Sequence, residues 1–365
     1  MLYYLSELTE WFSPLRVFQY TTFRAVGAAI TSLLICILTG PWFIRQLTAL
    51  KFNQPVRGPE ELRELAAHYG KKACPTMGGL FILWGMVDAV LLWAIPTNRL
   101  VLLCLATLLV LGAVGFLDDH AKIRRRKPHG LRARTKLLWQ LALGLLVGFY
   151  LLADAQFHER ARQLFVPFVK VPVADLGWWA ALWMALVIVA SSNAVNLTDG
   201  QDGLAIGCTL TVALTFAVMC FVTGHHGMAH YLNLPHIPAA SELVVVCAAL
   251  SGASLGFLWF NCHPAEIFMG DTGSLAIGGL LGAIALMIKQ ELALVLVGGV
   301  FVMEAASVLL QVASYKLRGG KRIFLMTPIH HHFERLGWSE TKVTVRFWVL
   351  SVIFALLGLA TLKLR

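Results

Sequence analysis

The sequence predicts an all-α, polytopic integral membrane protein of about ten transmembrane helices, with both termini on the outer side of the membrane. Of its 365 residues, 58% are hydrophobic and only 14% are charged, whereas soluble domains carry about 25% charged residues. Apolar runs recur along the whole chain, and each is long enough to cross a hydrocarbon core about 30 Å thick. Lysine and arginine also cluster in alternate loops, which indicates an orientation.

The apolar runs define the expected helices, and we expect residues 1–365 to form a single membrane-embedded domain. The first twenty residues contain Glu7 and Glu10 and lack a basic start followed by an apolar core, so no cleavable signal is expected. The predicted spans are about 22–40, 76–95, 99–117, 137–152, 177–195, 203–223, 242–260, 273–288, 292–312 and 345–362.

The basic loops indicate which side of the membrane each connection occupies. Most of the 30 lysines and arginines fall in loops 41–75, 118–136 and 313–344, whereas the connection 224–241 has none. Cytoplasmic loops carry the excess of positive charge, so these basic loops are expected in the cytoplasm and the termini outside. The net charge of +10 is therefore a topology signal, and no nucleic-acid partner is expected.

Small residues and cysteines are interpreted as packing elements. Gly252 with Gly256, and Gly278 with Gly282, have the spacing that allows helices to approach closely. The seven cysteines contain no CxxC pair and fall mostly in apolar runs, so neither a disulfide framework nor a zinc site is expected. No P-loop nucleotide motif occurs.

A polar stretch, residues 193–203, interrupts two apolar runs. It contains Asn193, Asn196, Asp199 and Asp202. Carboxylates in or beside a bilayer cost a few kcal/mol and usually face a polar cavity or an ion. The two acids would share a face if the stretch were helical. A polar turn that caps two helices is the simpler alternative, but four oxygen-bearing side chains so close together favour a functional site.

Other polar motifs fall on the same predicted cytoplasmic side. They are residues 71–79, the pair Asp118–Asp119 with Lys122 one turn later, residues 261–274, and the run His330–His332. Their convergence on one face is stronger support for a site than any single motif. The outer histidines, by contrast, are interpreted as part of a wet loop rather than a metal site; they are His225, His226, His230 and His236.

The acidic pair closes the third predicted span. Adjacent residues diverge by about 100° on a regular helix, so Asp118 and Asp119 can point at one atom only if the helix ends there. The helix dipole disfavours acids at a carboxyl end, which predicts a compensating cation or metal.

Two further motifs offer ligands for phosphate. The turn at residues 270–274 could be a simple N-cap, but it also combines Asp271 with backbone amides at a helix start, which suits an anion. Three consecutive histidines cannot all ligate one metal from a regular helix. In a loop, His330, His331 and His332 could donate hydrogen bonds to phosphate or sugar.

The ligand types suggest the chemistry. Aspartate and asparagine oxygens without thiolates select a hard ion such as Mg²⁺, which typically shares the phosphates of a substrate. Neighbouring lysines and arginines favour a phosphorylated substrate, as in phosphoryl-transfer sites. A site at a membrane face suits one water-soluble and one lipid substrate.

Several motifs resemble those of the phospho-N-acetylmuramoyl-pentapeptide transferase family over nearly the whole chain. They are P-T-M-G-G at 75–79, F-L-D-D-H-A-K at 116–122, N-A-V-N-L-T-D-G-Q-D-G-L-A at 193–205, N-C-H-P-A-E-I-F-M-G-D-T-G-S-L-A at 261–276 and P-I-H-H-H-F-E at 328–334. The resemblance implies Mg²⁺-dependent transfer of phospho-MurNAc-pentapeptide from UDP-MurNAc-pentapeptide to undecaprenyl phosphate, which gives lipid I and UMP. It also implies the bacterial cytoplasmic (inner) membrane, contact with membrane lipid and a cytoplasmic active site, and is compatible with a homodimer.

The resemblance further implies residue roles. Asp271 would bind Mg²⁺, and Asp118 and Asp119 would be the catalytic pair together with Asp271. The implied substrate-binding residues are Lys71, Thr76 and Lys122 for phosphate, Asn196, Asp199 and Asp202 for nucleotide or pyrophosphate, Phe268 for stacking on uracil, Asn261, and His330, His331 and His332 in the nucleotide-sugar pocket.

Two alternatives remain open from the sequence. A polytopic transporter would also carry carboxylates at broken helices, but near the middle of the bilayer rather than at the ends of spans. A related transferase of phospho-GlcNAc to the same lipid is the second alternative; the run of histidines favours the muramoyl branch, by resemblance.

Overall fold

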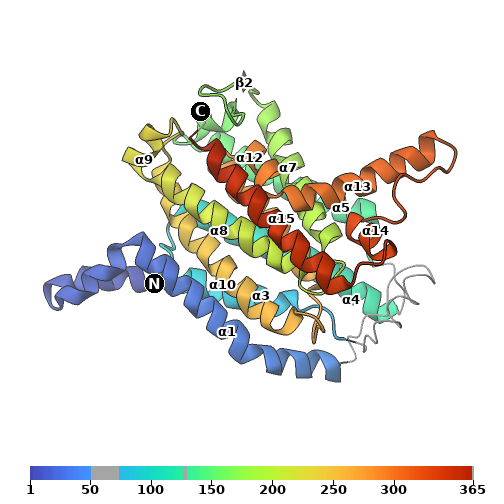
Figure 1. The fold of residues 1–365 in the computed structure, drawn as a ribbon. Helices are drawn as coiled ribbons and strands as arrows, with labels where there is room; N and C mark the ends of the chain where they lie inside the picture. Colours follow the sequence, from blue (N-terminus) through green and yellow to red (C-terminus); the bar gives the residue numbers. More distant parts are fainter. Residues whose placement is uncertain (51–73, 126–129, 364–365) are drawn as a thin grey trace.

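The computed structural model describes residues 1–50, 74–125 and 130–363, which form a bundle of helices (Figure 1). The main helices are α1 (Thr21–Ala49), α3 (Gly79–Trp93), α4 (Arg99–Arg125), α5 (Ala133–Ala153), α7 (Trp179–Thr198), α8 (Leu204–Gly224), α10 (Leu243–Asn261), α11 (Gly270–Met287), α12 (Glu291–Val297), α13 (Gly299–Leu317) and α15 (Glu340–Thr361). The short elements are η1 (Leu2–Glu10), η2 (Ser13–Gln19), α6 (His158–Arg162), β1 (Gln163–Leu164), β2 (Ala174–Asp175), α9 (His226–Tyr231), η3 (Pro238–Glu242) and α14 (Ile329–Arg335).

The predicted all-α, polytopic class is confirmed. In the described part of the chain, nine helices are long and apolar enough to cross a membrane. The remaining predicted span is α3, an apolar helix of 15 residues. The only strands among the described residues are β1 and β2, two residues each, which pair antiparallel between α6 and α7.

The prediction of one continuous span at 292–312 is wrong. The chain there forms two helices, α12 and α13, separated at Gly298. Two consecutive glycines weaken the helix because they have no side chain to limit backbone freedom. A Cβ on Gly299 would lie 2.6 Å from the ring of Phe354, so the break also lets α13 pack tightly on α15.

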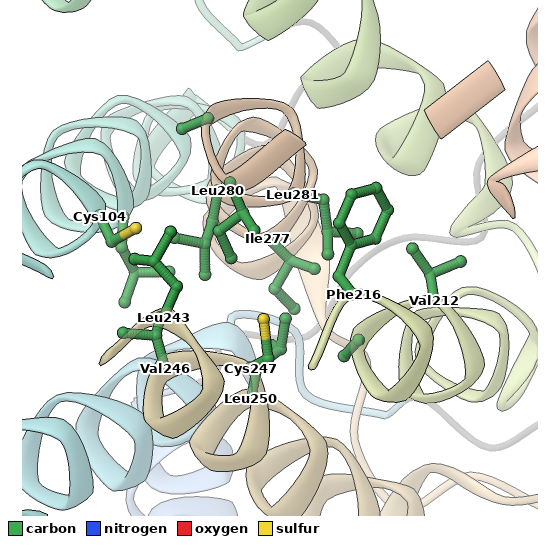
Figure 2. Close-up of a cluster of buried hydrophobic side chains, with 14 of the residues drawn as sticks. Cys104, Val212, Phe216, Leu243, Val246, Cys247, Leu250, Ile277, Leu280 and Leu281 are labelled. Carbon is green, nitrogen blue, oxygen red and sulfur yellow. The ribbon is translucent and has the colours of Figure 1, made fainter. Parts of the chain in front are cut away.

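Helix α11 is the centre of the bundle, and all of its residues are buried. It packs between α4 and α7. Figure 2 shows its apolar side chains facing those of α4, α8 and α10; the labelled residues are Cys104, Val212, Phe216, Leu243, Val246, Cys247, Leu250, Ile277, Leu280 and Leu281. A helix surrounded on every side is apolar all round instead of along one stripe. Asp271 lies in the first turn of α11 and is buried with the rest of the helix.

The glycine pairs are confirmed as packing positions. A Cβ on Gly252 would lie 2.0 Å from the carbonyl oxygen of Ala29, and one on Gly256 would lie 2.5 Å from Cβ of Cys36, so both let α10 approach α1. Gly278 and Gly282 similarly bring α11 against Ser191 and its neighbours on α7. Close contact of this kind replaces the hydrophobic driving force that is absent between helices in lipid.

The first residue, Met1, and the last described residue, Lys363, lie at the same end of the bundle. There, Arg24 of α1 donates to Glu242 across 2.7 Å, and the amino group of Met1 donates to backbone oxygens at the carboxyl end of α3. Lys363 lies 3.4 Å from the ring centroid of Tyr231, just beyond α8. The polar motifs occupy the opposite end, where α4, α7, α10 and α13 finish and α5, α8, α11 and α15 begin.

Candidate active site

Three buried aspartates meet at the motif end of the bundle. Asp118 and Asp119 come from α4, and Asp271 comes from the first turn of α11. Each offers one carboxylate oxygen, and these oxygens all lie within 4.8 Å of one another. The close approach depends on Gly115, where a Cβ would lie only 2.2 Å from the carbonyl oxygen of Asp271.

Helix α4 does not end at the acidic pair, as the sequence suggested, but continues to Arg125. The two carboxylates accordingly have different partners. Asp119 accepts hydrogen bonds from the amide and the hydroxyl of Thr272, at 3.0 and 2.9 Å, at the start of α11. Asp118 accepts one from the amide of Leu131, at 2.8 Å. Both carboxylates nevertheless reach Nζ of Lys122, so the expectation that they could meet at one atom only at a helix end is wrong. Helix α11 brings Asp271 alongside them and completes the three-acid cluster.

Compensating cations are present at the acids, although α4 continues beyond them to Arg125. The positive end of the α11 dipole lies at Asp119. Two lysines provide the cations. Lys122 forms ion pairs with Asp118, with Asp119 at 3.3 Å and with Asp271 at 2.9 Å. Lys136 lies 3.0 Å from Asp271 and 3.5 Å from Asp118. Two ammonium groups thus stand among three carboxylates.

Lys136 is a residue that the sequence analysis missed. It was counted only as part of the basic loop that indicates topology. Its position one helical turn into α5 could have been a signal, because a lysine at the start of an apolar span can extend along the end of the bundle. The fold places its ammonium group directly on Asp271.

Asn196 and Thr76 are close to the same centre. The amide of Asn196 donates to Asp271 at 3.1 Å and to the hydroxyl of Ser274 at 2.8 Å. The hydroxyl of Thr76 is buried and has no hydrogen-bond partner among the described residues. Gly270, with φ of 72°, lies between Thr76 and Asp119, and a Cβ there would clash with both side chains.

Asp202 and Asn261 belong to a second polar cluster. Asp202 accepts from Nδ1 of His263 at 3.0 Å and from the amide of Ala265 at 3.2 Å. Asn261 accepts from the amide of Gly203 at 3.1 Å and donates to the carbonyl of Ile267 at 2.8 Å. These bonds join the α7–α8 turn to the connection between α10 and α11, so the structure gives both residues a role in holding the two loops together.

The α7–α8 turn is not helical, so Asp199 and Asp202 do not share a helix face. Asp199 is the C-terminal cap of α7 and is partly exposed. Phe268 is also partly exposed, and its backbone pairs with Pro75 and Gly78 at 2.9 Å each. Stacking of Phe268 on a base stays a prediction. Lys71 lies outside the described residues.

The three histidines lie on the short helix α14, not in a loop, and they diverge. His330 is fully buried, and its Nδ1 lies 3.0 Å from a carboxylate oxygen of Glu304 on α13. His331 pairs with Glu334 at 2.6 Å, and His332 accepts from the amide of Leu325 at 3.2 Å. Glu304 was missed, although a lone carboxylate in an apolar span was a visible signal.

The environment of α14 changes the protonation of the second histidine. Burial, reinforced by the neighbouring His330, lowers the pKa of His331 below its usual range. For Glu334, burial opposes ionisation, but the hydrogen bond and charge of His331, with smaller contributions from Gln201 and His330, together hold the pKa of that carboxyl below its usual range. Both shifts disfavour an added proton at this helix.

An apolar cavity of about 360 Å³ runs beside the site between α7, α12 and α13, and we call it the α7–α13 groove. It is lined by Trp183, Leu186, Val187, Ala190, Ser191, Ala194, Val195, Leu281, Glu291, Leu292, Leu294, Val295, Gly298, Phe301, Val302, Ala305, Ala306 and Leu309. Ala194 and Val195 directly precede Asn196 on α7, so the groove extends to within one helical turn of a residue that contacts Asp271. The break at Gly298 shapes its opposite wall.

The fold and the site together define a polytopic membrane protein with a carboxylate- and lysine-rich site at one end of its bundle, beside an apolar groove. Residues 101–289 match the family model of glycosyl transferase family 4. The chain is 53% identical over 367 residues to a phospho-N-acetylmuramoyl-pentapeptide-transferase of Methylacidiphilum infernorum (isolate V4), and the match covers 100% of both chains. The chain therefore belongs to the phospho-N-acetylmuramoyl-pentapeptide-transferase family, and the resemblance of its motifs is confirmed.

Proposed function

We propose that the protein transfers phospho-MurNAc-pentapeptide from UDP-MurNAc-pentapeptide to undecaprenyl phosphate, which gives lipid I and UMP in peptidoglycan synthesis. Family membership supports the reaction. The observation that carries the proposal at this chain's own residues is the cluster of Asp118, Asp119 and Asp271 with two lysines. A phosphoryl transfer needs such a combination of metal ligands and cations around the reacting phosphates.

The aspartate cluster suits Mg²⁺. Its donors are carboxylate oxygens alone, which are the ligands that hard divalent cations prefer. Asp271 would hold the ion together with Asp118 and Asp119, and at least one lysine would move aside. When bound, Mg²⁺ would neutralise negative charge on the transferring phosphoryl group.

The two lysines suit the diphosphate of the nucleotide substrate. Lys122 and Lys136 are now paired with carboxylates, and both are partly accessible, with side chains 13% and 22% exposed. If the ion takes over their carboxylate partners, their ammonium groups are free to bind phosphate oxygens. The hydroxyl of Thr76 supplies a further donor at the same place.

The α7–α13 groove suits the lipid acceptor. Its lining is almost entirely apolar, and it reaches the turn of α7 that carries Asn196. An isoprenoid chain lying in the groove would present its phosphate to the aspartate cluster. This arrangement also disfavours the transporter alternative, because the carboxylates lie at the end of the bundle rather than at its middle.

We favour direct attack by the acceptor. The second proton of a phosphate monoester has a pKa of about 6, so most of the acceptor is already a dianion at neutral pH. An oxygen of the lipid phosphate attacks the phosphorus that carries the sugar, the bond from that phosphorus to the bridging oxygen breaks, and UMP leaves with the electron pair. Asp118 is surrounded by two lysines and the amide of Leu131, which supports a positioning role for it.

The orientation and location follow from charge. The basic loops 41–75, 118–136 and 313–344 connect helices that end or begin at the motif end of the bundle, which supports a site that faces the cytoplasm from the inner membrane. A cytoplasmic site has direct access to a nucleotide-linked substrate. The oligomeric state is a separate proposal, and a homodimer is compatible with this orientation.

An assay of UMP release tests the function. Purified protein with UDP-MurNAc-pentapeptide, undecaprenyl phosphate and Mg²⁺ should release UMP and form a lipid-linked product. UDP-GlcNAc in place of the muramoyl substrate should give no UMP. Release from UDP-GlcNAc alone would favour the phospho-GlcNAc branch, and no release from either substrate would remove the transferase assignment.

A further inference from the structure

Glu304 is a carboxylate with no role in the cluster of aspartates. It lies on α13, is fully buried, and has His330 of α14 as its ion-pair partner. Nδ1 of His330 lies 3.0 Å from Oε2 of Glu304. The other carboxylate oxygen, Oε1, has no hydrogen-bond partner among the described residues. The recorded hydrogen-bond partner of the Glu304 carboxylate is therefore the imidazole of His330.

The opposite nitrogen of the same imidazole is also unsatisfied. Nε2 of His330 is buried and has no hydrogen-bond partner in the described part of the chain. It faces the α7–α8 turn, because a Cβ on Gly200 would lie 2.4 Å from it. Gly200 stands between Asp199 and Gln201, next to the residues expected to meet the nucleotide. Buried polar groups without partners are rare in native proteins and often mark a function.

The charge of the Glu304–His330 pair bears on whether Nε2 is a hydrogen-bond donor or an acceptor. A carboxylate and an imidazole buried together avoid a net charge, because an uncompensated buried ion is costly. One neutral form of the pair is an ionised Glu304 that faces an imidazolium across the recorded contact to Nδ1. In that form both ring nitrogens carry a hydrogen, so Nε2 presents an N–H donor to the turn.

We propose that Glu304 is a positioning residue that acts through His330: it orients the ring by Nδ1 and keeps a hydrogen on Nε2, which becomes a donor to a phosphate oxygen of the nucleotide substrate. The role of the phosphate rests on the proposed function. Without a substrate, Nε2 of His330 lies beside Gly200 and has no acceptor among the described residues. A phosphate oxygen of the substrate would become its acceptor when the substrate binds at the α7–α8 turn. Hydrogen bonds of a catalytic site are often incomplete before the substrate is bound.

The neighbouring histidines show that this arrangement is specific to one position. His331 pairs with Glu334 on its own helix, and His332 accepts from the loop amide of Leu325. Both contacts are local to α14 and the loop before it. The bond from His330 to Glu304 instead ties α14 to α13, where the following residue, Ala305, lines the groove. It thereby links the nucleotide side of the site with the lipid side.

Glu304→Gln is the decisive variant, because it preserves size and can still accept from Nδ1 while removing the charge. Without the carboxylate the buried ring has no counter-charge and becomes neutral, so it no longer carries a hydrogen on both nitrogens and loses its charge-assisted donor. We expect kcat/KM to fall by about 10- to 100-fold, as when the partner of a site histidine is removed. His330→Gln should change the same kinetic parameters, and the double variant should be no worse than His330→Gln alone.

Glu242→Gln is the matched control. Glu242 is also a buried, ion-paired carboxylate, but it lies at the opposite end of the bundle with Arg24. The control should lower thermal stability and leave kcat/KM of the folded fraction within about twofold. Additive losses in the Glu304→Gln/His330→Gln double variant would overturn the proposal, and so would a similar kinetic loss in the control.

A spectroscopic readout separates this inference from the transferase assignment. In ¹⁵N-histidine-labelled protein, the His330 signals are identified by their loss in His330→Gln. Both ring nitrogens should carry a hydrogen in the wild-type protein, and only one of them should do so in Glu304→Gln. A bare Nε2 in the wild type would overturn the proposal even if Glu304→Gln failed to fold. The expected signature in a protein without transferase activity would instead contradict the proposed function and leave the pair intact.

Discussion

At the scale of residues, the site is a balance of charge rather than a set of independent ligands. The carboxylate of Asp271 contacts three side chains: Lys122 at 2.9 Å, Lys136 at 3.0 Å and Asn196 at 3.1 Å. Removing its charge therefore changes the partners of two cations as well as the proposed metal ligand. This connectivity explains why a single substitution should act strongly on turnover and weakly on folding.

Asp271→Asn should lower kcat by at least about a hundredfold while the protein remains folded. Loss of a metal-binding charge costs several kcal/mol of transition-state stabilisation, and each 1.36 kcal/mol is tenfold in rate. UMP release at ordinary Mg²⁺ concentration measures the effect. Asp88→Asn, on the exposed face of α3, is the matched control and should be active. Turnover similar to wild type in Asp271→Asn would exclude it from the metal site.

The histidine helix should make stability depend on pH. Because the pKa of His331 is lowered by burial and by His330, the unfolded chain binds a proton more readily than the folded protein. Stability from this group is therefore lost as pH falls through the ordinary range of histidine, from about 7 to 5.5. The melting temperature should decrease over that range, and less so in His331→Gln. An equal decrease in both proteins would contradict this assignment.

At the scale of elements, hydrophobic runs were enough to predict the spans, because a helix in lipid must satisfy its backbone internally. The details that failed depend on tertiary packing. The carboxyl end of α4 extends beyond the acidic pair, where Asp119 accepts from Thr272 of α11, and Gly299, at the break before α13, packs against Phe354. Neither partner is near in sequence, so local patterns could not reveal them.

The groove gives a test at this scale. Ala190 is an exposed small residue on α7 that lines the groove, and Ala190→Phe would fill it without disturbing the core. We expect the KM for undecaprenyl phosphate to rise by about tenfold or more, since each buried methylene contributes about 0.8 kcal/mol. The KM for the nucleotide substrate should stay the same.

Ala106→Phe is the control for that substitution, because Ala106 is exposed on α4 and does not line the groove. It should leave both KM values unchanged. If Ala190→Phe raised the KM for the nucleotide and left that for the lipid unchanged, the lipid would have to bind elsewhere.

At the scale of the whole molecule, the distribution of charge was the most informative property of the sequence. It predicted that the polar motifs share one face, and the fold brings Asp118, Asp119, Asp271, Asn196 and Lys122 together there. The contacts of Lys136 and Glu304 required the three-dimensional arrangement, because their partners are far away in the chain. The individual roles of the site residues remain predictions.

The orientation of the bundle can be measured by cysteine labelling on intact cells. In a Cys262→Ser background, which removes the exposed native thiol, an impermeant reagent should modify His230→Cys. It should spare Arg124→Cys until the cells are opened. The reverse pattern would place the aspartate cluster on the outer face, away from any cytoplasmic nucleotide.

The central claim is that the aspartate cluster moves the phospho-sugar directly from nucleotide to lipid. A single-turnover experiment with sugar-labelled UDP-MurNAc-pentapeptide, Mg²⁺ and protein stripped of lipid phosphate tests it most directly. No UMP should appear until undecaprenyl phosphate is added, and then one labelled lipid should form for each UMP released. One equivalent of UMP per site before the lipid is added, with the label retained on the protein, would contradict direct transfer.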